Sequence, residues 1–141
     1  MTAVLLDSLL RPIPWLQSFG IDDAMIDREH LGLIRLCNEI CAQAAQDTGT
    51  AHERLMREDM AGQLALHFAH EERILDEIGF TDAFLHRREH DHIRGLTTPL
   101  YSQRLESSFA RALLQARTGL VEHIIRHDLG FKSHLMDRAG F

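Results

Sequence analysis

The chain has 141 residues and carries 15 lysines and arginines against 21 aspartates and glutamates, so its formal net charge is −6. A chain of this length can bury roughly 68% of its unfolded surface as one domain. Its content of 45% apolar and 26% charged residues excludes a disordered chain. The acidic balance argues against a nucleic-acid-binding protein, which needs a basic face. The unusual feature of the composition is its 10 histidines.

The N-terminal segment does not have the pattern of a targeting signal. Asp7 interrupts its short apolar run, and no basic segment precedes that run. No stretch of the chain approaches the ~20 apolar residues that span a bilayer. Two cysteines do not form a disulfide framework, so the expected location is the cytoplasm.

Residues 1–21 are predicted to form an irregular arm. Pro12 and Pro14 flank a single residue and disfavour a helix there. Trp15 and Phe19 are expected to pack this arm against the body of the protein.

Four amphipathic helices are predicted after the arm, because apolar residues recur at helical spacing in four stretches. Asp27 is the expected N-cap of the first helix, and Gly79 is suited to follow the end of the second. The first helix is expected from near Asp27 to the turn at 47–50, and the second from Ala51 to Ile78. The third is expected from Thr81 or Asp82 to near 96–99, and the fourth from Ser107 or Ser108 to near Gly130.

The expected fold is all-α. No strand-like alternation is found, and short connections make neighbouring helices antiparallel, which favours an up-down-up-down four-helix bundle. The chain is predicted to be a single domain over 1–141, with an arm (1–21), a bundle (22–131) and a tail (132–141).

Histidines fall on the inward-facing stripe of every predicted helix. His67 and Glu71 are four residues apart, and so are His86 and His90. Residues four apart lie on one helix face, so each pair can direct two side chains at one ion. The candidate metal ligands are His30, His67, Glu71, His86, His90, His123 and Asp128.

A metal site has to be weighed against an ordinary core. A single histidine on an apolar stripe is more often a satisfied core residue than a ligand. Burying five imidazoles and two carboxylates without a cation would, however, be costly. Seven ligands suit two metals better than one. If both carboxylates and one solvent oxygen bridge the two metal ions, the five histidines divide three and two between these ions. The octahedral ion with two histidines then has five ligands and keeps one open position.

Asp128 follows His123 by five residues. On a regular α-helix these two residues point about 140° apart. Both can reach one site only if the helix ends or widens there, and a π-type turn would serve.

Four segments carry this pattern: IDREH at 26–30, HFAHEE at 67–72, HRREH at 86–90 and HIIRHD at 123–128. Together, and in this order, they resemble the hemerythrin family, specifically the bacterial hemerythrins (bacteriohemerythrins). The resemblance covers about Trp15 to Phe131.

This resemblance implies a non-haem di-iron centre that binds dioxygen reversibly, for transport, storage or sensing. It implies that His86, His90 and His123 hold one iron, that His30 and His67 hold the iron with the open position, and that Glu71, Asp128 and a solvent oxo or hydroxo group bridge the two.

Other functions remain open beside this one. The same centre could serve an enzyme that scavenges peroxide or nitric oxide, or an iron- or redox-responsive binding module. We expect a binding protein rather than an enzyme. The expected partners are dioxygen and other small diatomics or anions, with no nucleic acid and no membrane span; the oligomeric state is unknown.

The expected pocket lining is Ile34, Gly119, Leu120 and Ile124, with Phe68 as packing. The hemerythrin family often has a tryptophan at the position of Gly119. The glycine is therefore either a tolerated residue at a kink or a feature that widens the pocket or opens a path for small ligands.

The remaining histidines and the cysteines are interpreted as ordinary residues. Cys37 and Cys41 could form a thiolate metal pair, but their apolar stripe favours small core residues. His70 could be a spare ligand, but a position at a helix boundary is expected. His127 could lie beside the ligands or help to move protons, but a partly exposed residue is expected. His52, His92 and His134 are expected at the surface.

Overall fold

The computed structural model describes residues 11–21, 23–46, 51–98 and 106–128; the side chains of 18, 44–46, 51–53, 106–110 and 126–128 are not among those described. Within these ranges the chain is helical and contains no strand, which confirms the all-α prediction for them. No helix in the described ranges is both long and apolar enough to cross a membrane.

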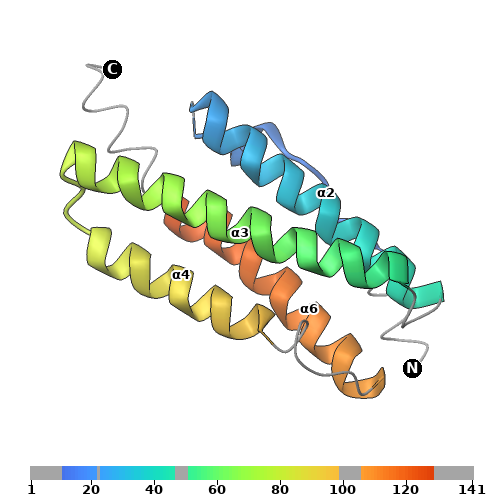
Figure 1. Cartoon of the computed structure of the whole chain (residues 1–141). Helices are drawn as coiled ribbons and strands as arrows, with labels where there is room; N and C mark the ends of the chain where they lie inside the picture. The colour runs from blue at the N-terminus through green and yellow to red at the C-terminus, as the bar shows by residue number, and fades with distance from the viewer. Residues whose placement is uncertain (1–10, 22, 47–50, 99–105, 129–141) are drawn as a thin grey trace.

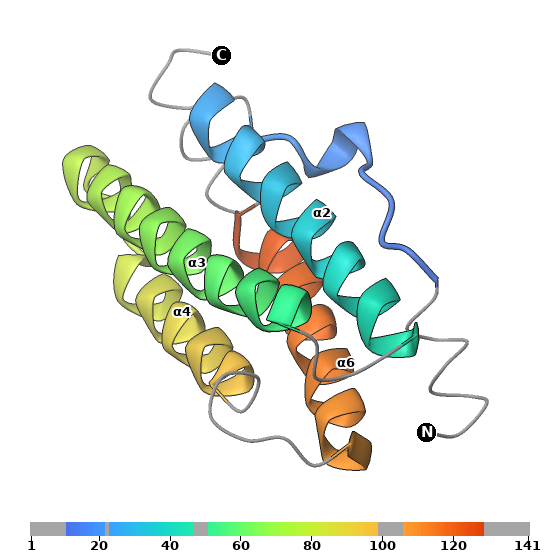
Figure 2. The ribbon, with the colours of Figure 1, turned by 45° about the vertical axis from the view of Figure 1, so that its right-hand side comes forward.

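Four long helices contact one another in a closed ring (Figures 1 and 2). α3 packs against α2 and α4, and α6 packs against α4 and α2. This arrangement is compatible with a four-helix bundle, while the up-down-up-down order stays a prediction. In chain order the elements are η1 (Gln17–Phe19), α2 (Ala24–Gln46), α3 (Ala51–Ile78), α4 (Ala83–Thr97), α6 (Glu106–Glu122) and the π-helix η2 (His123–Asp128).

The start of α2 differs from the prediction. The helix begins at Ala24, so Asp27 lies in its first turn and is not the N-cap. Asp23 takes that role, because its Oδ1 accepts a hydrogen bond from the Ile26 N–H at 3.0 Å. Asp27 Oδ1 instead accepts from the Ile21 N–H at 2.8 Å. Both aspartates are good capping residues, but Asp23 directly precedes the helix, whereas Asp27 Oδ1 is bonded to the N-terminal arm.

The end of α3 was predicted correctly. Gly79 has a positive φ of 65°, the left-handed conformation that glycine adopts without strain. The Phe80 N–H bonds the Leu75 carbonyl at 3.0 Å, and the Gly79 N–H bonds the Asp76 carbonyl at 3.3 Å. These two bonds form a Schellman motif, which satisfies the last carbonyls of the helix.

The N-terminal arm is attached to α2 and to the core, as predicted. The Ile13 N–H bonds Asn38 Oδ1 at 2.8 Å, and Asn38 Nδ2 bonds the Ile13 carbonyl at 2.9 Å. Phe19 is buried, and Trp15 packs edge-on against it with ring centroids 5.8 Å apart.

The interior consists of two apolar clusters. The smaller one contains Ile21, Ile26 and Leu75. Along α2, His30 separates Ile26 from the larger cluster, and along α3 Glu71 separates Leu75 from it. The buried polar layer therefore lies between the two apolar clusters. The larger cluster includes Leu33, Ile34, Cys37, Ile40, Cys41, Met60, Leu64, Phe68, Ile93, Leu113, Leu120 and Ile124.

Gly62, inside α3, and Gly79, directly after its end, should respond oppositely to substitution by alanine. Gly79→Ala should lower the free energy of unfolding by about 1–2 kcal/mol, because a Cβ is disfavoured at positive φ. Gly62→Ala should raise it by up to about 1 kcal/mol, because Gly62 is inside the helix and no atom of another part of the protein lies within 4 Å of the added Cβ. Denaturant unfolding measures both values, and changes of the same sign would contradict the assignment of Gly79 as the cap.

Candidate metal centre

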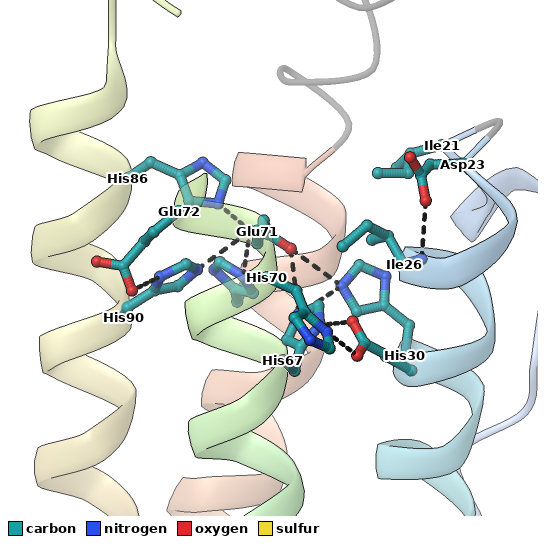
Figure 3. A network of polar contacts seen from close by, with 12 residues as sticks. Ile21, Asp23, Ile26, His30, His67, His70, Glu71, Glu72, His86 and His90 are labelled. Atoms are coloured by element: carbon teal, nitrogen blue, oxygen red, sulfur yellow. Dashed lines mark hydrogen bonds and ion pairs between the residues drawn. The ribbon is translucent and has the colours of Figure 1, made fainter. Parts of the chain in front are cut away.

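Buried polar side chains from all four sides of the ring meet at one level of the bundle (Figure 3). Glu71 is the buried carboxylate of this layer and is 0% exposed. The histidines around it are each at most 2% exposed: His30, His67, His86, His90 and His123. They form two groups whose ligand atoms lie within 4.8 Å of one another and could hold a metal ion: His30, His67, Glu71 and His123, and Glu71, His86, His90 and His123.

One oxygen of Glu71 faces α2 and the preceding turn of α3. Its Oε2 lies 3.1 Å from His67 Nε2 and 3.6 Å from His30 Nε2. The two nitrogens are themselves only 3.1 Å apart. Two imidazoles and one carboxylate oxygen therefore converge on a single small volume.

The other oxygen of Glu71 faces α4 and η2. Its Oε1 lies 3.1 Å from His90 Nε2 and 3.4 Å from His123 Nε2. It also contacts His86 Nε2. The carboxylate thus has two histidines on one oxygen and three on the other.

Glu71 is held in its charged form. Burial by itself raises the pKa of this carboxyl group, but hydrogen bonds from the surrounding imidazoles outweigh burial and hold the pKa well below its usual range. A buried negative charge is therefore present to attract a cation. The imidazoles that lower the pKa are those of His123, His30, His67 and His86.

His90 is held in its neutral form. Burial lowers the pKa of this imidazole, and the neighbouring His123 and His86 lower it further, against the opposing effect of Glu71. A neutral imidazole is the form that binds a metal.

Glu29 is a functional candidate that the sequence reasoning missed. Its Oε1 lies 3.1 Å from His67 Nδ1, and its Oε2 lies 2.6 Å from His70 Nδ1. Burial alone would lower the pKa of His67, but the hydrogen bonds to Glu29 and Glu71 outweigh it and raise the pKa. Glu29 thereby orients the His67 ring so that Nε2 faces the centre, an arrangement common around metal-bound histidines. The available signal was its position directly before His30.

Glu72 approaches His90 in a similar way. Its Oε2 lies 3.3 Å from His90 Nδ1, without hydrogen-bond geometry, and 3.3 Å from an Arg94 nitrogen. Arg94 also lies 5.0 Å from the ring centre of Phe68. Phe68 is fully buried and stacks on the His90 ring at 4.1 Å with an angle of 16°. The predicted packing role of Phe68 is confirmed, and its contact is with a ligand candidate.

The π-helix η2 bears on the predicted pairing of His123 with Asp128. It spans His123–Asp128, so the helix widens at this point, as the spacing of the two residues required. A π-helix bonds residues five apart, which brings them onto one side of the backbone. The Asp128 side chain lies outside the described residues, so its ligand role stays a prediction.

The residues expected to line a pocket divide into two sets. Ile34, Leu120 and Ile124 are buried in the larger apolar cluster. Gly119 is also buried, but a Cβ added to it would lie only 2.6 Å from Leu96 Cδ1 of α4. The glycine therefore admits the Leu96 side chain between α4 and α6.

An open hollow of about 380 Å³ also includes Gly119. Ile34, Leu120 and Ile124 are not part of its lining, which consists of His92, Leu96, Leu114, Gln115, Thr118, Gly119 and Glu122. A path from this hollow to the centre stays a prediction.

The other histidines and the cysteines can be placed in part. His70 lies inside α3, where its side chain is 25% exposed, and His92 is exposed. Cys37 and Cys41 are fully buried, which confirms their assignment to the core. The side chains of His52, His127 and His134 lie outside the described residues.

Comparison with known proteins gives no identification: no family model and no curated protein matches the chain. The resemblance to the hemerythrin family therefore stays a prediction that depends on the four segments and on the geometry described above.

Glu29 can be tested through metal affinity. Glu29→Gln should weaken Zn²⁺ binding about 10- to 100-fold, because the His67 ring loses the carboxylate that orients it. Glu39→Gln is the matched control, since it makes the same change at an exposed position of the same helix. Competition titration with a chromophoric chelator measures both affinities, and equal losses would refute the orienting role.

The contact between Leu96 and Gly119 can be tested with a double-mutant cycle. The effect of Gly119→Ala on the free energy of unfolding should be less favourable in the wild type than in a Leu96→Ala background, because the added Cβ would lie 2.6 Å from Leu96 Cδ1. We expect a coupling of about 1 kcal/mol between the two sites in denaturant unfolding. Additive effects would show that Leu96 does not occupy this space in solution.

Proposed function

We propose that the chain is an up-down-up-down four-helix bundle that holds two iron ions and binds dioxygen reversibly. The observation that carries the proposal is the division of five buried histidines between the two oxygens of Glu71. Three nitrogens lie on one side and two on the other, so two ions bound there would differ by one protein ligand.

The proposed ligand assignment follows from this division. His86, His90 and His123 would hold one iron on the Oε1 side, and His30 and His67 would hold the other on the Oε2 side. Glu71 would bridge the two ions. Asp128 is proposed as the second bridging carboxylate, because the π-helix η2 is the widening that its spacing from His123 requires.

The residues present fit a bound cation. Glu71 Oε2 is fully buried, and the imidazole nitrogens of His67 and His30 lie 3.1 Å and 3.6 Å from it. A buried carboxylate surrounded by imidazole nitrogens offers a cation both a compensating charge and neutral ligands. The mixed imidazole and carboxylate donors suit non-haem iron.

When bound, a pair of ferrous ions supplies the electrons with which dioxygen is held. The chain contributes the surroundings. Ile34, Leu120 and Ile124 are each at most 1% exposed and lie within one helical turn of a proposed ligand, so they keep water from that side. Glu29 and Phe68 hold the rings of His67 and His90 in place.

Anaerobic reconstitution with ferrous iron, followed by dioxygen and then by purging, tests the proposal. We expect uptake of about two iron ions per chain and a visible charge-transfer band that appears with dioxygen and disappears on purging. Glu71→Gln should lose most of the iron, because it removes the central charge. His92→Gln should keep the iron, because His92 is exposed.

Two other results would change the conclusion. Irreversible conversion to a ferric form with consumption of peroxide would favour a scavenging enzyme built on the same centre. Binding of well under two iron ions by the folded wild-type chain would contradict the di-iron proposal itself.

A further inference from the structure

The side chains of the candidate centre are shut off from solvent. The five histidines and Glu71 are each at most 2% exposed. An ion that reaches them has to pass partly exposed side chains at the edge of the polar layer. Two carboxylates lie there, Glu29 beside His67 and Glu72 beside His90, with side chains 18% and 23% exposed. These two carboxylates are the places where a cation from solvent first meets a negative charge next to the centre.

Glu72 is covered by positive charges. Its Oε1 lies 3.5 Å from Arg87 Nε, and its Oε2 lies 3.3 Å from an Arg94 nitrogen. A cation that approaches from this side meets two guanidinium groups at the carboxylate, and like charges repel. The Glu72 edge is therefore unfavourable for the entry of a metal ion.

Glu29 has imidazoles beside it instead. Its oxygens lie 3.1 Å from His67 Nδ1 and 2.6 Å from His70 Nδ1, and it forms no ion pair with an arginine of the described ranges. The arginines nearest in sequence have other partners, since Arg28 donates to a backbone carbonyl of α2 and Arg73 lies near a glutamate of α3. The Glu29 edge therefore offers a cation an attractive charge and further ligands.

His70 supplies this edge with a ligand that solvent can reach. Its side chain is 25% exposed and lies beside His67 on α3 (Figure 3). An imidazole nitrogen and a carboxylate oxygen 2.6 Å apart need only a small adjustment to bind one divalent cation at the usual ligand distances of about 2.0–2.2 Å. The cation takes the place of the hydrogen between these two atoms, and the other ring nitrogen of His70 then carries that hydrogen.

We propose that Glu29 and His70 form the entry site through which divalent transition-metal ions reach the candidate centre. The proposal rests on the metal centre of the proposed function, but it requires neither iron nor dioxygen. Only the ring of His67 separates the entry site from the centre, because its Nδ1 lies 3.1 Å from Glu29 Oε1 and its Nε2 lies 3.1 Å from Glu71 Oε2. The ion therefore arrives first on the Oε2 side, beside His30 and His67.

An entry site differs from a ligand of the centre in what its loss changes. Ions enter and leave by the same route, so removal of an entry ligand slows loading and release equally and leaves the dissociation constant unchanged. Loss of a residue that binds the ion in the centre, or that orients such a ligand, weakens equilibrium binding instead. Glu29 also orients His67, so His70 is the residue that separates the two roles.

The test loads the full-length, metal-free chain with Zn²⁺, which has no redox chemistry. Stopped-flow mixing with a chromophoric chelator measures loading, transfer from the loaded chain to excess chelator measures release, and competition titration measures the dissociation constant. His70→Gln keeps an amide that can donate to Glu29 but removes the imidazole. His92→Gln is the matched control, because it makes the same change at an exposed position of α4.

We expect His70→Gln to slow both loading and release at least about fivefold, with a dissociation constant within about twofold of the wild-type value. His70→Lys should slow loading about tenfold or more, because an ammonium group beside Glu29 repels the ion as the arginines do beside Glu72. His92→Gln should load at the wild-type rate.

Loading of His70→Gln at the wild-type rate would overturn the proposal. So would faster release with weaker affinity, because His70 would then support the bound ion. A folded wild-type chain that binds no Zn²⁺ would contradict both the entry site and the centre. Slow loading of His70→Gln in a chain that shows no reversible dioxygen band with iron would contradict the proposed function alone. Far-UV circular dichroism checks that each variant is folded, and if His70→Gln is not, the loading rate of His70→Lys decides.

Discussion

The charge of Glu71 is the constraint on which the rest of the interior depends. A carboxylate without contact to water costs several kcal/mol unless charges and hydrogen bonds compensate for it. Here the compensation comes from imidazoles on both of its oxygens, supplied by α2, α3, α4 and η2. One helix could not surround a carboxylate in this way. The polar layer therefore requires all four sides of the ring, and it favours a packing in which the helices meet at this level.

The apolar clusters and the outer polar contacts keep this layer in a defined geometry. Apolar packing on either side lowers the local dielectric, which strengthens the electrostatic interactions with Glu71. Glu29 holds His67 from behind, while Phe68 covers the face of His90 and lies against Arg94. Because the rings are held by neighbours other than a metal, their nitrogens are directed at the centre by the fold itself.

The sequence by itself determined the helices, the end of α3 at Gly79 and the buried histidines, because helical periodicity, capping residues and four-residue spacing are local properties of the chain. Only the tertiary structure decided how closely the histidine nitrogens approach each oxygen of Glu71, that Glu29 supports His67, and that Phe68 stacks on His90. Local spacing sets which side chains share a helix face. Which face meets which neighbour depends on the rotation and packing of whole helices, and that is a property of the assembled core.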